Sequence, residues 1–558
     1  MITFALFLLL PLGALLVAQR LVRRLGPKVS AALGALPDWR WAPLAAGAVT
    51  GLVILYLWGW TLSQTPIVHD EASYLLQAQT FAKLRWTMPS PPIPAFFEQF
   101  HVLVTPVFAS KYPPGHGILL VPGIWLGAPG LMPTLFAVAC GALLFALVRR
   151  VANGWVAVLT VLLWLGVRTN LMFRPTYFSE TSSSMVWLLG WWALLEWRER
   201  GGERWLIAVA ACVAFMGITR PLTAVAFALP IGVVVLRQVV RRRSWRALLK
   251  PALVALAIVA VMPLWSAKTI GSWKTTPYSL YSKVYFPFDV MGFGFDSTPA
   301  QRQLPPDMVK FRKAFGTMHA KYTADRAPAA FLDRWKVLTY EDAFARWRLP
   351  FAAFAVAGLA LLGSAGWFAV ASSLLLTLCY LSFAHPRDWT LYYLEITPLL
   401  PFLIATGLWG TWGMIAQRTA KIRPLIIRQQ SAPAALAAVF VALLLLLPVR
   451  AEIVRQRRVL DLRRSYRLSF LNVVAKIPDK RAMIFIRYEP RHDVNYSLIA
   501  NDADLAAART WFVYDRGASK NKALAAAAPT RIPYLFDESS GTLMRLVPTQ
   551  LSARTRGE

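Results

Sequence analysis

The chain has 558 residues, of which 57% are hydrophobic and 16% are charged, and its mean hydropathy is +0.47. It is too apolar for an ordinary soluble protein and too long for a single domain. The composition therefore excludes a soluble globular enzyme and predicts an integral membrane protein.

Apolar stretches of about 20 residues, the length needed to cross a bilayer, recur along the chain. They lie near 1–19, 42–62, 118–148, 155–173, 183–197, 205–219, 222–240, 247–266, 349–363, 366–384, 390–412 and 431–449. Proline and glycine interrupt the third stretch, so part of it is expected to lie in the interface. The sequence predicts a multi-pass α-helical protein with about twelve transmembrane helices.

Lysine and arginine follow the first, third, fifth, seventh and eleventh stretches. Loops rich in these residues face the cytoplasm. The long loops 63–117 and 267–348, and everything after 450, are therefore predicted to lie on the outer side.

The predicted domains are three. Residues 1–41 form an extra N-terminal span with a basic cytoplasmic loop, 42–449 form the transmembrane module with its two long external loops, and 450–558 form a small external α/β domain. In the last part, a helix with a basic face precedes four short strands near 482–487, 510–515, 532–537 and 542–547, with a helix at 519–528. A Gly-rich phosphate loop and a nucleophile elbow are both absent from its sequence, so we expect support or acceptor docking there.

The segment "IVHDEASYLLQAQTFAKLRW" places Asp70 and Glu71 directly behind the second apolar stretch. A helix beginning at residue 70 would carry an apolar face and a polar face and lie on the outer leaflet. The alternative is that Asp70 caps this helix and Glu71 favours its dipole.

The formal net charge of +32 raises the question of nucleic-acid binding. The cationic residues are spread over cytoplasmic loop ends and two external segments, without an aromatic-basic stripe or a nucleic-acid motif. We therefore exclude nucleic acid as a partner. An excess of external cations suits anionic lipid headgroups or phosphates.

Four short motifs follow one another along the chain. In order, they are "HDEASYLLQAQTFAK", "SKYPPGHGILLVPGIWLG", "FRPTYFSET" and "HPRDWTLYYLEITPLLPFL". Over roughly 42–412 this order resembles the polytopic glycosyltransferases of the C-type fold, such as protein O-mannosyltransferases and the lipid A aminoarabinose transferase. The resemblance implies a membrane-embedded transferase that uses a polyprenyl-phosphate sugar and needs one catalytic carboxylate, with inversion of the anomeric centre. It places the active site on the periplasmic side of a bacterial inner membrane.

The resemblance implies Asp70 as the general base, with Lys111 and Arg387 as cations for the leaving phosphate. In the lipid A enzymes the basic residue directly precedes two prolines, whereas here Tyr112 separates Lys111 from Pro113. Glu71 is the second catalytic candidate, expected to orient Asp70 or hold a metal, and the alternative is that it only supports the helix dipole.

Further residues are candidates for substrate binding, although a structural role is an alternative for several of them. They are Tyr112, His116, Glu180, Lys283 and Tyr392. Glu180 can instead cap a helix, a lone histidine such as His116 is often only an interfacial polar residue, and Tyr392 can belong to an aromatic belt. Arg220 and Arg174 are equally well explained by snorkelling to headgroups.

The predicted partners are a lipid-linked sugar donor, an exported lipid, glycan or protein acceptor, and the membrane. A divalent metal is left open as a cofactor. The alternative function is a transporter or flippase of lipid-linked saccharides. Transport favours charged residues near the midplane of the bilayer and repeated halves, whereas the acids here cluster at one face and we find no repeat.

Overall fold

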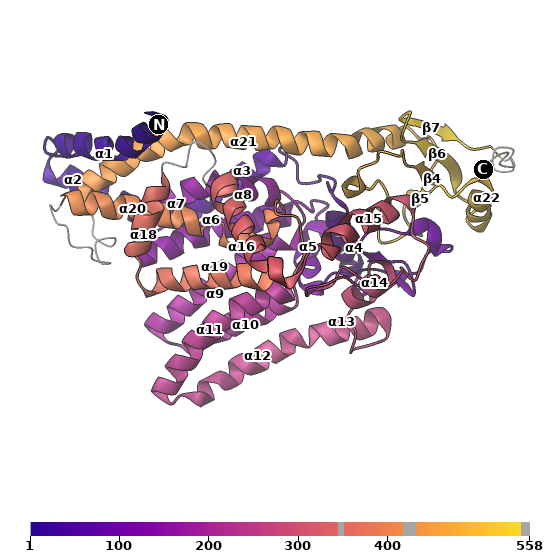
Figure 1. Cartoon of the computed structure of the whole chain (residues 1–558), viewed down its shortest axis with the longest axis horizontal. Coiled ribbons are helices and arrows are strands. Elements are labelled where there is room, and N and C mark those ends of the chain that lie inside the picture. The colour runs from indigo at the N-terminus through magenta and orange to yellow at the C-terminus, as the bar shows by residue number, and fades with distance from the viewer. Residues whose placement is uncertain (1, 344–350, 417–430, 548–558) are drawn as a thin grey trace.

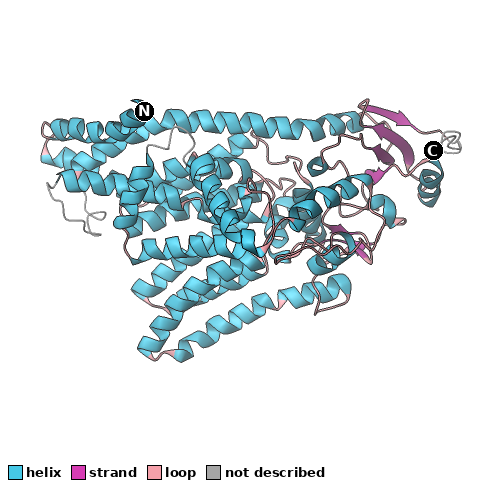
Figure 2. Ribbon diagram, in the orientation of Figure 1, coloured by secondary structure: helices cyan, strands magenta, loops and turns pink. Residues whose placement is uncertain are grey.

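The computed structural model describes residues 2–343, 351–416 and 431–547. Helices form most of the molecule, and two small sheets lie at one end (Figure 2). The helices of the apolar part are α1 (Ile2–Val22), α2 (Pro27–Ala35), α3 (Ala42–Leu57), α6 (Leu131–Val151), α7 (Gly154–Leu165), α8 (Arg168–Phe173), α9 (Ser179–Arg200), α10 (Glu203–Gly217), α11 (Pro221–Arg242), α12 (Leu249–Val259), α13 (Val261–Ile270), α18 (Ala352–Ala360), α19 (Ser364–Tyr380) and α20 (Leu399–Ala416).

A multi-pass membrane protein is confirmed, but the count of twelve spans is not. In the described residues, five helices are long and apolar enough to cross a membrane, or up to six if the bent pair 27–38 and 42–57 is one span. Several predicted spans are helices of fewer than 18 residues, such as α7, which has 12 residues and ends before Gly166, and α18, which has 9.

Two parallel helices, α9 and α11, show that the two ends of the bundle differ in their side chains. Helices α9 and α11 have 22 residues each, or about 33 Å, close to the roughly 30 Å of a bilayer's hydrocarbon. Each begins among buried polar residues and ends in arginines. The turn between α9 and α10 is formed by Gly201 and Gly202, whose φ angles of 70° and 91° suit glycine.

The polar starts of these helices meet the segments that lie outside the apolar bundle. These are α4 (His69–Ala82), β1 (Met88–Pro89), β2 (Val102–Leu103), β3 (Val107–Ser110), α5 (Pro114–Trp125), α14 (Pro277–Tyr285), α15 (Pro306–Ala320), α16 (Ala327–Lys336) and η7 (Thr390–Ile396). Strands β1, β3 and β2 form an antiparallel sheet in that order. The end of the bundle that they cover is called the polar end here, because buried polar residues such as Glu180 and Arg220 lie there. Helices α4, α14 and α15 are seen at this end in Figure 1.

Helix α4 begins at residue 69, one residue before the predicted start. It does not lie on a surface with one face exposed. Its buried residues include Glu71, Ala72, Leu76 and Thr80, which cover different faces of the helix. The expectation of a leaflet-bound helix is therefore wrong, because α5 and β3 pack against α4.

The C-terminal part is reached through one continuous helix, α21 (Ala432–Ala475), of 44 residues. The predicted domain boundary at 449/450 lies inside it. The strands β4 (Ala482–Arg487), β5 (Thr510–Tyr514), β6 (Ile532–Asp537) and β7 (Thr542–Arg545) and the helix α22 (Ala518–Ala527) follow at the predicted places. The sheet order is β5-β4-β6-β7, with only the last pair antiparallel.

One face of this sheet packs against the loop that follows α4. Phe97 stacks edge-on against Trp511 with ring centroids 5.1 Å apart, and Phe96 does the same with Phe485 at 6.0 Å. The Tyr514 hydroxyl donates to the Asp307 carboxylate of α15 at 2.8 Å. The sheet therefore supports the loops that build the polar end of the bundle.

Candidate functional site

A cavity of about 710 Å³ opens at the polar end of the bundle. Its wall is shared by α4, the segment 111–113, the starts of α9 and α11, α14, α15 and the segment 389–392. Side chains far apart in the sequence therefore face one space.

Asp70 enters this cavity from the first turn of α4. His69 Nδ1 lies 2.9 Å from Asp70 Oδ2, His101 Nε2 lies 3.5 Å from Oδ1, and the Tyr112 hydroxyl donates to Oδ1. Burial alone would raise the pKa of the Asp70 carboxyl, but the charge and hydrogen-bonding contributions of His101 and His69 hold it well below its usual range. Asp70 is therefore an ionised carboxylate with one edge toward the cavity.

The same three residues can bind a cation. One ligand atom from each of His69, Asp70 and His101 lies within 4.8 Å of the others. Imidazole and carboxylate are common ligands of divalent transition metals. This cluster is therefore where a divalent metal would be held.

Glu71 points away from Asp70. Its Oε1 accepts the backbone N–H groups of Ile67 and Val68 at 3.1 and 3.4 Å, and its Oε2 accepts that of Tyr177 at 2.9 Å. Burial raises the pKa of this carboxyl to about 7, against the lowering effect of these donors. The side chain joins the start of α4 to the segment before α9 and is not among the residues that line the cavity.

Lys111 lies in the cavity wall with a side chain only 2% exposed. Its Nζ is 3.6 Å from Asp289 Oδ2 and lies 4.4 and 4.8 Å from the ring centres of Tyr278 and Tyr281. Burial lowers the pKa of Lys111, while Asp289 and Asp70 act in the opposite direction. The ammonium group is held by one carboxylate and two aromatic faces.

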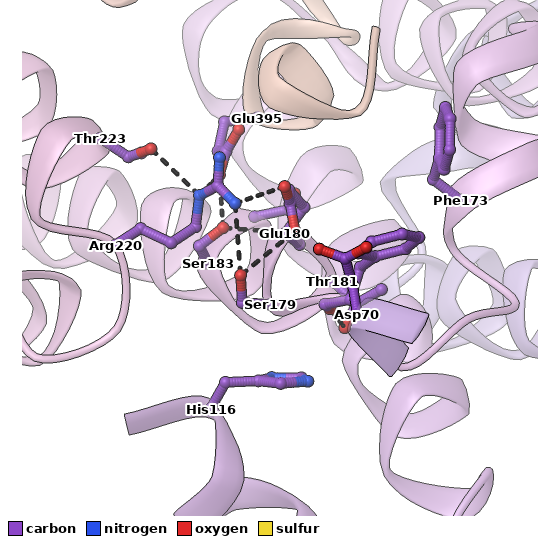
Figure 3. A network of polar contacts seen from close by, with 12 residues as sticks. Asp70, His116, Phe173, Ser179, Glu180, Thr181, Ser183, Arg220, Thr223 and Glu395 are labelled. Atoms are coloured by element: carbon purple, nitrogen blue, oxygen red, sulfur yellow. Dashed lines mark hydrogen bonds and ion pairs between the residues drawn. The ribbon is translucent and has the colours of Figure 1, made fainter. Parts of the chain in front are cut away.

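Arg220 is the centre of a second polar network, shown in Figure 3. Its guanidinium pairs with Glu180, donates to Ser179 Oγ at 3.2 Å and lies 3.8 Å from Glu395 Oε1. The Tyr74 hydroxyl, on α4, donates to the same Ser179 Oγ at 2.9 Å. Because the Tyr74 ring stacks on Tyr112 at 4.3 Å, this network continues to the group that holds Asp70.

The structure brings most of the predicted binding residues together. Tyr112, Glu180, Lys283 and Tyr392 line the cavity beside Asp70 and Lys111. His116 does not line it: its ring nitrogens hydrogen-bond with Ser182 Oγ at 2.9 Å and Tyr177 O at 2.8 Å, and it is fully buried.

Arg387 is also outside the cavity wall. Its side chain is 55% exposed and pairs with Glu341 at 3.2 Å. The reason is local: the turn after α19 directs His385 inward, where its Nε2 is 3.0 Å from the Tyr393 hydroxyl, and leaves Arg387 facing outward. A second buried cation in the cavity wall, besides Lys111, is Arg220, and its pairing with Glu180 rules out snorkelling to headgroups.

Two further groups were not expected from the sequence. His101 comes from a loop without a recognisable motif, and only the fold brings it to Asp70. Glu395 carried a usable signal, because a carboxylate at the edge of an apolar run requires a partner. That partner is Arg220, 175 residues earlier in the chain.

Comparison with a family model covers one of the four motifs, "FRPTYFSET". Residues 129–266 match the family model of the dolichyl-phosphate-mannose-protein mannosyltransferases. The resemblance predicted from the sequence is thus confirmed over this segment, which contains Glu180 and Arg220 but neither Asp70 nor Lys111. A search of curated proteins found no match.

Solved structures of two kinds are similar to the chain. ArnT from Cupriavidus metallidurans bound to undecaprenyl phosphate has 14% identity and a TM-score of 0.48, with 88% of this chain and 90% of that chain covered. The oligosaccharyltransferase of Archaeoglobus fulgidus has 11% identity and a TM-score of 0.38, with 89% and 70% covered.

The contacts of Glu71 yield a test of its role. In Glu71→Gln one side-chain oxygen becomes an amide, so at least one of the three backbone N–H donors loses its acceptor, at a cost of about 1–3 kcal/mol. We expect a clearly lower melting temperature in detergent, measured by tryptophan fluorescence. Glu203→Gln, which removes an exposed ion pair to Lys250, should change it little. An unchanged melting temperature with lost activity would instead assign Glu71 to catalysis.

Proposed function

We propose that the protein is an inverting glycosyltransferase of the C-type fold. It transfers a sugar from a polyprenyl-phosphate donor to an exported lipid, glycan or protein acceptor at the outer face of the bacterial cytoplasmic membrane. The observation that carries this proposal is that an ionised, accessible carboxylate, Asp70, faces the same cavity as the buried cations Lys111 and Arg220. The family match over 129–266 supports the same class of reaction.

Asp70 is suited to accept the proton of the acceptor hydroxyl. As the hydroxyl oxygen attacks the anomeric carbon, its proton becomes acidic and passes to the carboxylate. The bond between the anomeric carbon and the phosphate oxygen breaks on the opposite face of the sugar, so the configuration inverts. His69, His101 and Tyr112 hold the carboxylate in one orientation through this step.

The leaving polyprenyl phosphate needs cations near its oxygens more than it needs a proton. Lys111 and Arg220 are available in the cavity, and Lys283 of α14 lines it as well. The wall also contains Leu222 of α11 and Met262 of α13, which offer an apolar surface to the first part of a lipid tail.

The orientation of the enzyme rests on the positive-inside rule. Helices α9 and α11 end in Arg198, Arg200, Arg241 and Arg242, so this end belongs to the cytoplasm and the cavity end to the periplasm. The part 450–547 then lies outside and supports the loops around the cavity, where an acceptor approaches.

The donor class can be tested directly. We expect the full chain in lipid nanodiscs to release polyprenyl phosphate from a panel of undecaprenyl-phosphate hexoses and pentoses when a membrane extract supplies acceptors. The matching nucleotide sugars should not be used, since the described residues and the sequence lack a nucleotide-binding Gly-rich turn. Transfer from a nucleotide sugar with no lipid donor present would overturn the proposal.

Replacement of Asp70 tests the base. Asp70→Asn keeps the size of the side chain but cannot accept the proton, so we expect turnover to fall by roughly 10²-fold or more. Donor affinity and melting temperature should remain near those of the wild type. The control is Asp325→Asn, an exposed position in the external segment. Near wild-type transfer by Asp70→Asn would exclude Asp70 as the base.

Replacement of Lys111 tests the phosphate contact. A charged phosphate is present before the reaction as well as after it, so Lys111→Ala should weaken donor binding and lower the rate together. Arg387→Ala removes a cation outside the cavity and should leave both nearly unchanged. Titration with undecaprenyl phosphate measures the affinity. Equal losses in the two variants would contradict this assignment.

A further inference from the structure

A second cavity, of about 560 Å³, lies at the opposite end of the bundle from Asp70. It is enclosed by α6, α9, α11, α19 and the start of α20, and most of its wall is apolar, with residues such as Leu147, Leu194 and Phe402. The residues of α9 that line it run from Leu188 to Arg198, which is about 15 Å along the helix. That is about half of a bilayer's hydrocarbon thickness, so the cavity has the depth of one leaflet.

Four arginines lie at the mouth of this cavity: Arg198, Arg237, Arg241 and Arg242. In the part of the chain that the structure describes, none of them forms an ion pair. The carboxylates nearest to Arg198 along α9 are already engaged, because Arg150 pairs with Glu196 and Glu199 at 2.7 and 2.9 Å and Arg200 pairs with Glu196 at 3.2 Å. The mouth therefore carries positive charge without an internal counter-charge.

Polar atoms without a partner also line the cavity. Trp191 Nε1, Gln238 Nε2 and Glu395 Oε2 are buried and make no hydrogen bond within the described residues. Glu395 is 2% exposed and stands at the inner end, next to the Arg220 network. Of these, the Gln238 amide is next to Arg237 on α11, where a phosphate oxygen can accept its hydrogen bond.

We propose that this cavity binds an anionic glycerophospholipid of the cytoplasmic leaflet, with its phosphate at the four arginines and an acyl chain between α9, α11 and α19. Charge decides the occupant: the apolar wall accepts any hydrocarbon chain, but the arginine mouth selects a phosphate headgroup. The sugar donor is a different ligand, since its phosphate belongs beside Lys111 at the other end of the membrane helices.

The bound lipid would lie between two pairs of helices, α6 with α9 and α11 with α19, whose members pack directly on each other. Glu180 lies in the first turn of α9 and Arg220 directly precedes α11, so a lipid that fixes the other ends of these helices also fixes the network beneath the proposed active site. The binding itself requires no transfer reaction, so it can be measured whether or not the proposed function is correct.

The test compares two charge-matched variants of the full chain in detergent. Arg237→Gln/Arg241→Gln/Arg242→Gln removes three mouth arginines, and Arg204→Gln/Arg243→Gln/Arg246→Gln removes three arginines from the same end that do not line the cavity. A photoreactive phosphatidylglycerol is the probe, with phosphatidylcholine, undecaprenyl phosphate and inorganic phosphate as competitors. We expect the first variant to lose binding by about tenfold or more and the second to lose much less.

Cross-linked peptides should come from α9, α11 or α19, and only unlabelled phosphatidylglycerol should compete well. A third variant, Ala369→Trp, fills the cavity but keeps the arginines, and it should also lose the cross-link. Equal binding by both triple variants, or cross-links outside these helices, would overturn the proposal. Stronger competition by phosphatidylcholine or by undecaprenyl phosphate would overturn the choice of occupant, and competition by inorganic phosphate alone would exclude a lipid.

Discussion

Charge at the edge of a hydrocarbon layer has to be paired, and this requirement organises the polar end of the molecule. An unpaired ion removed from water costs several kcal/mol. Arg220 therefore stands between Glu180 and Glu395, and Lys111 stands against Asp289 and two tyrosine rings. Asp70 is held by two imidazoles and a phenol. All of these pairings except that of His69 with Asp70 join segments that are distant in the sequence, so the polar contacts also fix how the helices meet.

The two neighbouring acids of α4 show how differently such a requirement can be met. The Glu71 carboxylate accepts hydrogen bonds from three backbone N–H groups and so connects the start of α4 to the segment before α9. Asp70, one residue earlier, keeps an edge toward the cavity while its other contacts are side chains. Successive residues on a helix point about 100° apart, so only one of the two carboxylates can face the cavity. Asp70 is therefore free for the proposed chemistry, and Glu71, the next residue, has a structural role.

The helices α9 and α11 connect two regions of opposite character. Their first turns contribute to a cavity that contains carboxylates, cations and tyrosines, and their last turns contribute to an apolar cavity with an arginine mouth. The arrangement suits a membrane whose two faces present different ligands. At the polar end, the C-terminal sheet supports the loops around the cavity, because its face packs on Phe96 and Phe97 and its Tyr514 binds Asp307.

The sequence by itself determined the membrane class, the positions of the apolar helices, the four C-terminal strands and the candidate base, because hydropathy, periodicity and short motifs are local properties. It also placed Lys111, Tyr112, Glu180, Lys283 and Tyr392 among the binding residues, and these do line one cavity. Only the tertiary structure decided that Arg220 and His101 belong to the site, that Glu71 and His116 are held by internal hydrogen bonds, and that Arg387 faces outward. These outcomes depend on which distant segments meet. The sequence around a charged residue beside a membrane helix does not reveal whether its partner is solvent, a headgroup or a carboxylate 175 residues away.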